Sequence, residues 1–343
     1  MSSSVEDNLR TTAGPAARAG AAVARAPATG YTAPVALLDA LRAITRFDPP
    51  AALPDCDLAL LADVLEAHGL APLASWQVEH TRLGAGLPDA FRERLLTSFQ
   101  GVVNDNLTKL VTLRGLLRGI EDVPVVVLEA AAYVDWLYPH LAFRPLGELR
   151  LAVRGADGRR FAEAVKGTMS LARAGEGGRT AVFTDGTTDV ALQEGLWPGA
   201  PEDAALFERS RPYRVFGPGV ARPAPEEALL ATVADLALQG LFAPAIAQVD
   251  LRELLRGGVD APYVLERARA LGLSRALHGA TLVVAHLFPD VAEAAAAVRP
   301  PLGAAERLAV EQVAEAARDP ARLRHLRGAD AAARLVVAPR GRG

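Results

Sequence analysis

Val125-Val126-Val127-Leu128-Glu129-Ala130, followed by Arg144-Pro145-Leu146-Gly147-Glu148-Leu149-Arg150-Leu151-Ala152-Val153, is the stretch that decides the fold of this chain. Its first part is a short β-branched run that ends at a turn, which is typical of a central strand buried on both faces. Its second part carries polar residues at alternate positions of another strand. Because residues i and i+2 of a strand point to the same face, Glu148 and Arg150 share a face.

The pair Glu148 and Arg150 stands where two carboxylates would together bind a divalent cation. A guanidinium cannot ligate Mg²⁺. Its permanent positive charge repels the cation and can occupy the cation's place beside Glu148. The pattern therefore indicates an active-site frame from which acidic ligands are missing.

The order of these features resembles the bacterial family of uncharacterised nucleotidyltransferases, a branch of the polymerase-beta-like superfamily. The resemblance covers most of the chain after about the first thirty residues. Members typically have a helical lead-in, a strand ending in Leu-Lys-Gly, an Arg-Pro before an Asp-x-Asp strand, a later acidic strand position followed by Leu-His, and a helical C-terminal half. Arg144, Pro145, Gly147 and the dipeptide Asp250-Leu251 match this pattern.

Four departures from the family pattern concern the chemistry. Glu129-Ala130 replaces Lys-Gly, and the two aspartates fall on Glu148 and Arg150. Ala191 stands where the third carboxylate is expected, and Gln193 stands where the histidine is expected. The resemblance implies a nucleotidyltransferase fold, whereas the departures favour the loss of two-metal nucleotidyl transfer.

Three hypotheses concern the remaining carboxylates. Glu129 can form an ion pair with Arg150 that fills the former metal site, or it can form an acid–base pair with Glu148 in a repurposed cleft. Asp189 lies two residues before Ala191, on the same strand face and about 6–7 Å away. It can restore a third carboxylate if that strand is shifted by two residues. The catalytic candidates are thus Glu148, Glu129 and Asp189, and no metal-ligand set is predicted.

Candidate ligand-binding residues lie in or near the two strands that carry Glu129, Glu148 and Arg150. Tyr133 and Trp136 are notable in a chain with 5% aromatic residues, and they either stack on a ligand or pack between helix and sheet. The family pattern adds further candidate binding residues: Arg144, Gly147, Arg150 and Gln193.

Composition limits the partners. The net charge of −3 gives no general electrostatic reason for nucleic-acid binding, so no nucleic-acid partner is expected. The single cysteine, Cys56, excludes an intrachain disulfide framework. The N-terminal segment has no continuous apolar run, so a cytoplasmic location is expected. Residues 228–249 are apolar over about the length of a membrane span, but Asp235, Gln239 and Pro244 interrupt them, which favours a buried helix pair and no membrane association.

The periodicity predicts an α+β fold, with a small mixed-sheet nucleotidyltransferase-like core flanked by N-terminal and C-terminal helical regions. Within the core we expect a helix over 133–138, another over 160–169, and a hairpin around Asp185-Gly186. A Pro/Gly-rich connector is expected over 212–225. The expected parts are a disordered tail (1–34), an N-terminal helical region (35–122), the core (123–220), a C-terminal helical region (221–330) and a flexible tail (331–343).

Three functions remain open on the sequence. The first is a degenerate nucleotidyltransferase-fold protein that acts as a binding or accessory protein, or as a repurposed enzyme, in a biosynthetic pathway. A small-molecule ligand or a protein partner would fit this function, and no cofactor is required. The second is an active enzyme that uses Mg²⁺ and an NTP, through Glu148 with Asp189 or Glu129. The third is a purely structural subunit with an exposed apolar face on its C-terminal helices.

Overall fold

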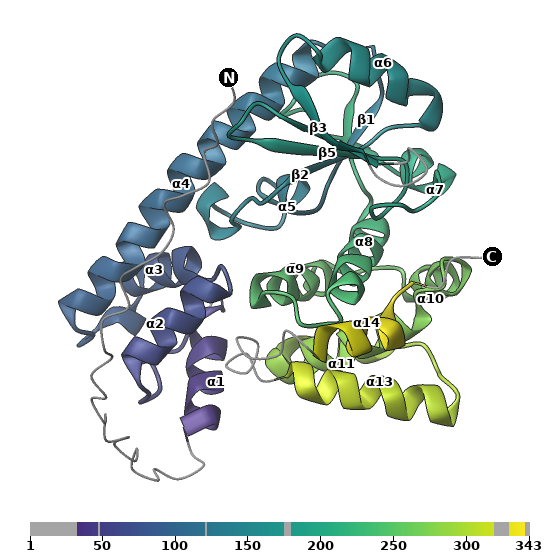
Figure 1. Ribbon diagram of the computed structural model, residues 1–343. Coiled ribbons are helices and arrows are strands. Elements are labelled where there is room, and N and C mark those ends of the chain that lie inside the picture. The colour runs from purple at the N-terminus through teal and green to yellow at the C-terminus, as the bar shows by residue number, and fades with distance from the viewer. Residues whose placement is uncertain (1–32, 47–48, 121, 175–179, 319–328, 340–343) are drawn as a thin grey trace, which may run out of the picture. The chain divides into compact units, whose positions relative to one another are not determined.

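The computed structural model describes residues 33–46, 49–120, 122–174, 180–318 and 329–339. The expected N-terminal tail lies outside these residues except for its last two positions, where helix α1 (Ala33–Ile44) begins. The fold is α+β, as predicted, with a mixed sheet flanked in the chain by helical regions (Figure 1).

The sheet contains seven strands in the described chain, in the order β3-β4-β5-β2-β1-β7-β6. The strands are β1 (Val125–Leu128), β2 (Leu149–Ala152), β3 (Ser170–Ala174), β4 (Thr180–Thr184), β5 (Asp189–Gln193), β6 (Arg211–Pro212) and β7 (Val220–Arg222). Strand β1 is antiparallel to β2 and parallel to β7, and β2 is parallel to β5. All four residues of β1 are buried, which confirms the prediction of a central strand.

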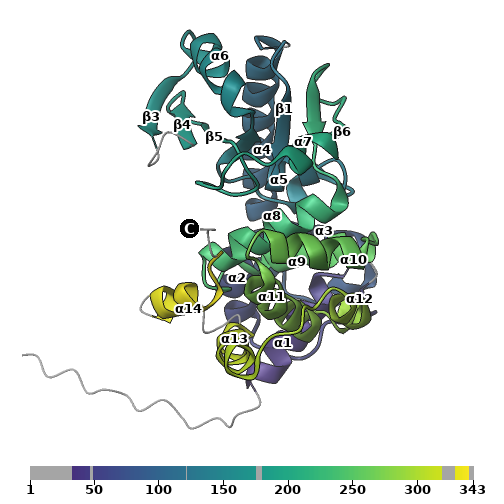
Figure 2. The ribbon, with the colours of Figure 1, turned by 90° about the vertical axis from the view of Figure 1, so that its right-hand side faces the viewer.

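Helices precede, connect and follow the strands. Along the chain, the helices that precede the first strand are α2 (Leu58–Ala67), α3 (Ala71–His80) and α4 (Asp89–Arg118). The helices between strands are α5 (Glu129–Tyr133), α6 (Gly155–Val165) and α7 (Ala204–Glu208). The helices that follow the last strand are α8 (Pro225–Leu238), α9 (Ala245–Arg256), α10 (Ala261–Ala270), α11 (Ser274–Leu287), α12 (Ala292–Ala297), α13 (Ala304–Ala317) and α14 (Ala329–Val337). Short 3₁₀ turns lie at η1 (Arg82–Gly84), η2 (Leu141–Phe143) and η4 (Pro289–Val291). In Figure 2, α9, α10 and α11 are neighbouring helices, and α8 packs against all three.

The apolar stretch over 228–249 forms the expected pair of buried helices, α8 and α9. Gly240 has a positive φ of 64°, and the amide of Leu241 donates to the carbonyl of Leu236, which together end α8 in a left-handed turn. Pro244 then precedes the first residue of α9. None of the described helices has the length and apolarity needed to cross a membrane.

The expected hairpin is confirmed. Strands β4 and β5 pair antiparallel, and the Asp185 carboxylate between them accepts hydrogen bonds from the amides of Thr187 and Thr188. Gly186 has a φ of 91°, which glycine adopts at little cost.

Four expectations about the elements were wrong. The helix predicted over 133–138 is α5, which ends at Tyr133. The helix predicted over 160–169 begins at Gly155, because the Glu202 carboxylate, distant in sequence, accepts a hydrogen bond from the amide of Gly155. The segment 212–225, expected to be a connector, contains strand β7. Residues 220–222 of β7 pair with β1, which supplies backbone hydrogen bonds that they cannot make with their neighbours in sequence. The expected C-terminal tail begins inside α14, so the helical region extends to Val337.

Candidate functional site

Glu129 lies at the end of β1, where the chain turns sharply into α5. Its φ of 51° is in the left-handed region, which a non-glycine residue adopts at a cost of about 1 kcal/mol or more. The Cα of the preceding residue, Leu128, is paired with that of Arg150 in β2. In this conformation the Glu129 carboxylate accepts a hydrogen bond from Nη1 of Arg150, so the predicted ion pair is present.

Three carboxylates surround the guanidinium of Arg150. Besides Glu129, Nη1 contacts Oδ1 of Asp235 at 3.1 Å, and Nε contacts Oε1 of Glu148 at 3.4 Å. Asp235 comes from α8, and its second oxygen accepts a hydrogen bond of 2.9 Å from Nε2 of Gln239, one turn further along that helix. Arg150 therefore joins the ends of two strands to α8.

The four charged side chains of this cluster are largely shielded, with 17–27% of each exposed. Burial, followed by the negative charge of Asp235, raises the pKa of Glu129 to about 7, although Arg150 opposes this rise. Burial alone would lower the pKa of Arg150, but Glu129 and Asp235 outweigh it and hold this pKa above its ordinary value. The guanidinium thus stays charged, while Glu129 can gain or lose a proton near neutral pH.

Arg144, a candidate ligand-binding residue, forms an ion pair within the protein. Its Nε lies 2.8 and 3.0 Å from the two carboxylate oxygens of Asp250 in α9, and the Tyr138 hydroxyl donates to the same carboxylate at 2.6 Å. Burial raises the pKa of Asp250, and Arg144 and Tyr138 only partly offset it. This buried group links the segment before β2 to α9.

Asn106 of α4 holds the turn that leads into β2. Its side-chain amide donates to the carbonyls of Leu141 and Arg144 at 2.7 and 3.0 Å, and its carbonyl oxygen accepts from the amide of Leu146 at 2.9 Å. Lys109, one turn further along α4, donates to the Leu146 carbonyl at 2.6 Å. Helix α4 therefore fixes the turn that precedes Glu148 and Arg150.

The aromatic candidates contact the protein interior. Tyr133 is fully buried, and its hydroxyl is hydrogen-bonded to Oγ1 of Thr232 at 2.8 Å and to the carbonyl of Ala228 at 3.2 Å. Trp136 packs edge-on against Tyr133, and the guanidinium of Arg222 lies 4.0 Å from the centre of a Trp136 ring. Gly147 has open space where a side chain would begin, so no close approach requires a glycine there.

Strand β5 supplies no acid beside Arg150. Ala191, the residue at the position where the family pattern has a third carboxylate, is paired with Arg150. Gln193 is buried and donates to the carbonyl of Gly195 at 2.8 Å, while its Oε1 has no hydrogen-bond partner within the described segments of the chain. Asp189 is exposed at the start of the strand, opposite Thr184, and it forms no ion pair among the described residues. In the described chain, no group of three or more His, Cys, Asp or Glu side chains is arranged to hold a metal ion.

Asp235 is the site residue that the sequence pattern did not identify. A signal was present, since Asp235 and Gln239 are polar residues four positions apart at the C-terminal end of α8 and so share one face. Both were interpreted only as interruptions of an apolar stretch. Asp250 was recognised as a family match, but its pairing with Arg144 depends on the packing of α9.

One of three comparisons with known proteins gives a match, and it identifies a family. A search of curated proteins and a search of solved structures each found no match. The family model described as "Uncharacterised nucleotidyltransferase" matches residues 54–289, which is more than half of the chain and includes the sheet, the Arg150 cluster and Asp250. The chain therefore belongs to the uncharacterised nucleotidyltransferase family.

Proposed function

We propose that this protein has lost two-metal nucleotidyl transfer and acts as a binding or accessory protein, in which the guanidinium of Arg150 takes the place of the catalytic cation. The observation that carries this proposal is the contact of one guanidinium with three carboxylates, those of Glu129, Glu148 and Asp235. In an active two-metal site, such carboxylates are free to hold the metal ions that bridge the nucleotide phosphates.

Electrostatics supports the proposal. A doubly charged cation about 4 Å from the Arg150 guanidinium would be repelled by roughly 8 kcal/mol at an effective dielectric constant of about 20. Moving Arg150 away would remove the guanidinium that Glu129 and Asp235 contact. Ala191, beside Arg150, has no oxygen with which to ligate a metal. The residues present therefore do not fit the Mg²⁺ ions that the family implies.

A second candidate function is metal-independent acid–base chemistry in the same cleft. Its support is the pKa of about 7 at Glu129, because a general acid or base works best when its pKa is near the working pH. Glu148 would then be the partner carboxylate, as both contact Arg150. An accessory role in a biosynthetic pathway is compatible with either function.

Thermal unfolding of the full chain with ATP, GTP, CTP and UTP, each with and without Mg²⁺, tests the main proposal. A ligand that binds only the folded state must raise its stability. We expect no Mg²⁺-dependent rise with any nucleotide. A rise that Glu148→Ala abolishes would overturn the proposal in favour of an active nucleotidyltransferase.

A gain-of-function variant makes the test sharper. Arg150→Asp removes the internal cation and adds a carboxylate between Glu129 and Glu148, so this variant should bind Mg²⁺ or Mn²⁺ in isothermal titration. Arg173→Asp is the matched control, because Arg173 also lies near Glu148, at 3.7 Å, but is 74% exposed. Equal metal binding by the wild type and by Arg150→Asp would contradict the assignment of Arg150 as a cation substitute.

A further inference from the structure

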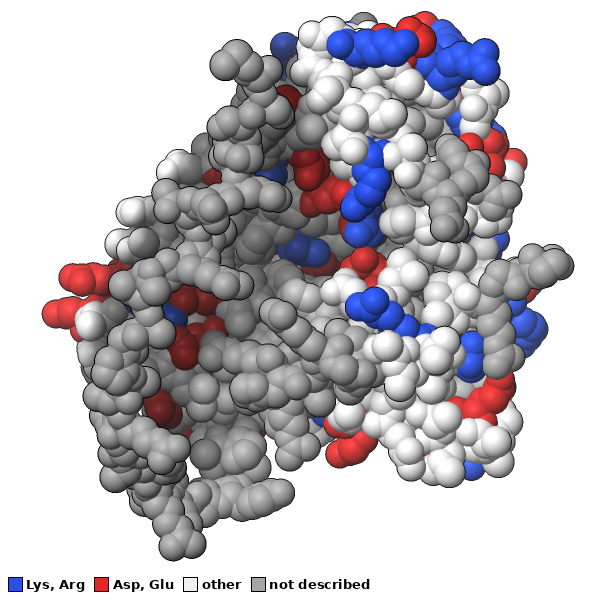
Figure 3. Space-filling model, in the orientation of Figure 1, with Lys and Arg blue, Asp and Glu red and all other residues white. Residues whose placement is uncertain are grey.

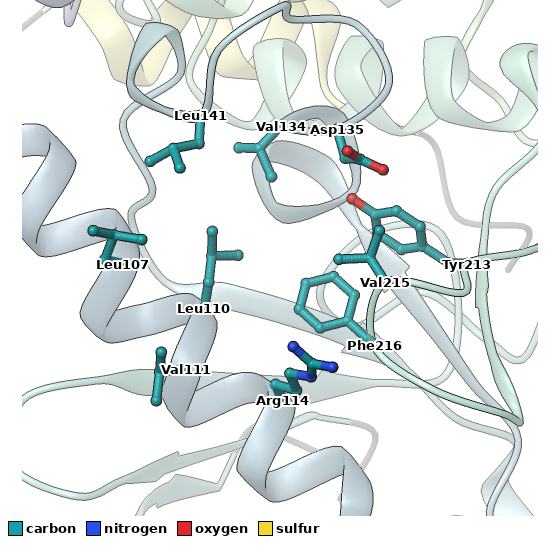
Figure 4. A pocket seen from close by; sticks show the side chains of 10 residues that line it. All are labelled: Leu107, Leu110, Val111, Arg114, Val134, Asp135, Leu141, Tyr213, Val215 and Phe216. Atoms are coloured by element: carbon teal, nitrogen blue, oxygen red, sulfur yellow. The ribbon is translucent and has the colours of Figure 1, made fainter.

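A cavity of about 250 Å³ lies between α4 and the chain that connects β6 to β7 (Figure 4). Tyr213 lines it and is hydrogen-bonded to Val220, the strand partner of Val125. Arg150 is paired with Leu128, which lies three residues after Val125 in β1. Side chains alternate between the two faces along a strand, so Leu128 and Arg150 point to the face opposite to that of Val125 and Val220. The cavity is thus a separate site, and binding of a ligand there is independent of the proposed function.

The cavity wall is mainly apolar. Leu107, Leu110 and Val111 of α4 face Val134 and Leu141 across it, and Val215 and Phe216 close a further side (Figure 4). Leu107, Val111 and Val215 are 45%, 70% and 46% exposed, and so are among the few large apolar side chains that the described chain leaves open to solvent. A hollow surrounded by exposed apolar side chains is typical of a ligand site.

Positive charge exceeds negative charge around this cavity. The guanidinium of Arg114 is turned toward the ring of Phe216 (Figure 4), and it forms no ion pair in the part of the chain that the structure describes. Arg118 lies one turn further along α4, and Arg214 precedes Val215; both are exposed.

Among the described residues, Asp135 is the one acidic side chain in the lining, and it has a positive neighbour, Arg222. Asp135 raises the pKa of Arg222, although burial and the adjacent Arg211 lower that pKa more strongly. Arg211 and Arg222 are paired directly across β6 and β7, with like charges facing each other. The surroundings therefore attract an anion rather than a cation.

We propose that this cavity binds a small apolar molecule that carries one carboxylate or other oxyanion. Its apolar body would lie between α4 and Phe216, and its anionic group would accept hydrogen bonds from Arg114, whose planar guanidinium suits an oxyanion. The concave shape favours a single small molecule over a lipid bilayer, whose surface is flat. On the face drawn in Figure 3, acidic and basic side chains of the described residues are interspersed.

Isothermal titration of the full chain with octanoate, octylamine and octan-1-ol tests this site, because the three probes share one apolar chain and differ in the charge of the head group. We expect octanoate to bind at least tenfold more tightly than octylamine, with octan-1-ol between them. Arg114→Glu should reverse the order of octanoate and octylamine. Val111→Trp should weaken all three, because it fills the mouth of the cavity from an exposed position.

Both changes are at exposed residues, so circular dichroism should show folded variants. Arg173→Glu is the matched charge reversal on a strand outside the cavity, and it should leave octanoate binding unchanged. The proposal is overturned if octanoate does not bind, if octylamine binds as well as octanoate does, or if Arg114→Glu retains the wild-type affinity for octanoate.

Discussion

Glu129 and Arg150 meet across two neighbouring strands, because Leu128, the last residue of β1, is paired with Arg150 of β2. Glu129, which directly follows Leu128, has a φ of 51° in the left-handed region, and its carboxylate forms an ion pair with Arg150. Strain of this kind persists where surrounding contacts hold it, here the shared guanidinium.

Arg150→Ala should lower the free energy of unfolding by about 3 kcal/mol, because three carboxylates would lose the cation that offsets their mutual repulsion. Millimolar Mg²⁺ should restore part of this loss in the variant and have little effect on the wild type. Urea unfolding with and without Mg²⁺ measures both effects. Arg173→Ala, an exposed neighbour of Glu148, should change the stability by less than about 0.5 kcal/mol.

The pKa of Glu129 predicts a dependence of stability on pH. It is raised from 4.5 to about 7 in the folded protein, so the folded state holds a proton that the unfolded state has already lost. The stability from this group is complete below pH 4.5 and is lost as the pH rises through 7, by up to roughly 3 kcal/mol.

Glu129→Gln removes the titrating group and should flatten the stability profile between pH 5 and 8. Urea unfolding across this range provides the comparison. Glu163→Gln, at an exposed position, is the control and should reproduce the wild-type slope. An equal slope in the wild type and in Glu129→Gln would assign the pH dependence to other groups.

Asp250→Asn should lower the free energy of unfolding by about 3 kcal/mol, because it leaves the guanidinium of Arg144 buried without its charge partner. Tyr138→Phe removes one hydrogen bond to the same carboxylate and should cost about 1 kcal/mol. Asp189→Asn, at the exposed start of β5, should be nearly neutral. A loss of less than about 1 kcal/mol in Asp250→Asn would show that this pair does not hold α9 to the segment before β2.

Asn106→Ala should expose the turn before β2, because three backbone groups lose their partner. We expect a loss of about 3 kcal/mol and faster hydrogen exchange at the amide of Leu146. Asn104→Ala, on the exposed side of the same helix, is the control. Unchanged exchange at Leu146 would mean that α4 does not restrain this turn.

The sequence pattern predicted the parts of the site that depend on neighbouring residues in a strand. Glu148 and Arg150 share a face because of the two-residue repeat. The pairing of Ala191 in β5 with Arg150 in β2 was found only in the structure. The Asp185 turn was also predictable, since an Asp-Gly pair between two β-branched runs has a local cause. The start of α6 was missed, because its first amide is bound by Glu202, distant in sequence.

The sequence by itself determined the buried strand β1, the shared strand face of Glu148 and Arg150, and the α+β class with helical flanks, because these depend on periodicity and residue type. Only the tertiary structure decided that Asp235 contacts Arg150 and that Asp250 forms an ion pair with Arg144. It also decided that an apolar cavity with arginines at its edge lies on the opposite face of the sheet. Each of these joins side chains that are distant in the sequence. Such contacts depend on how whole elements pack, which no local pattern in the chain specifies.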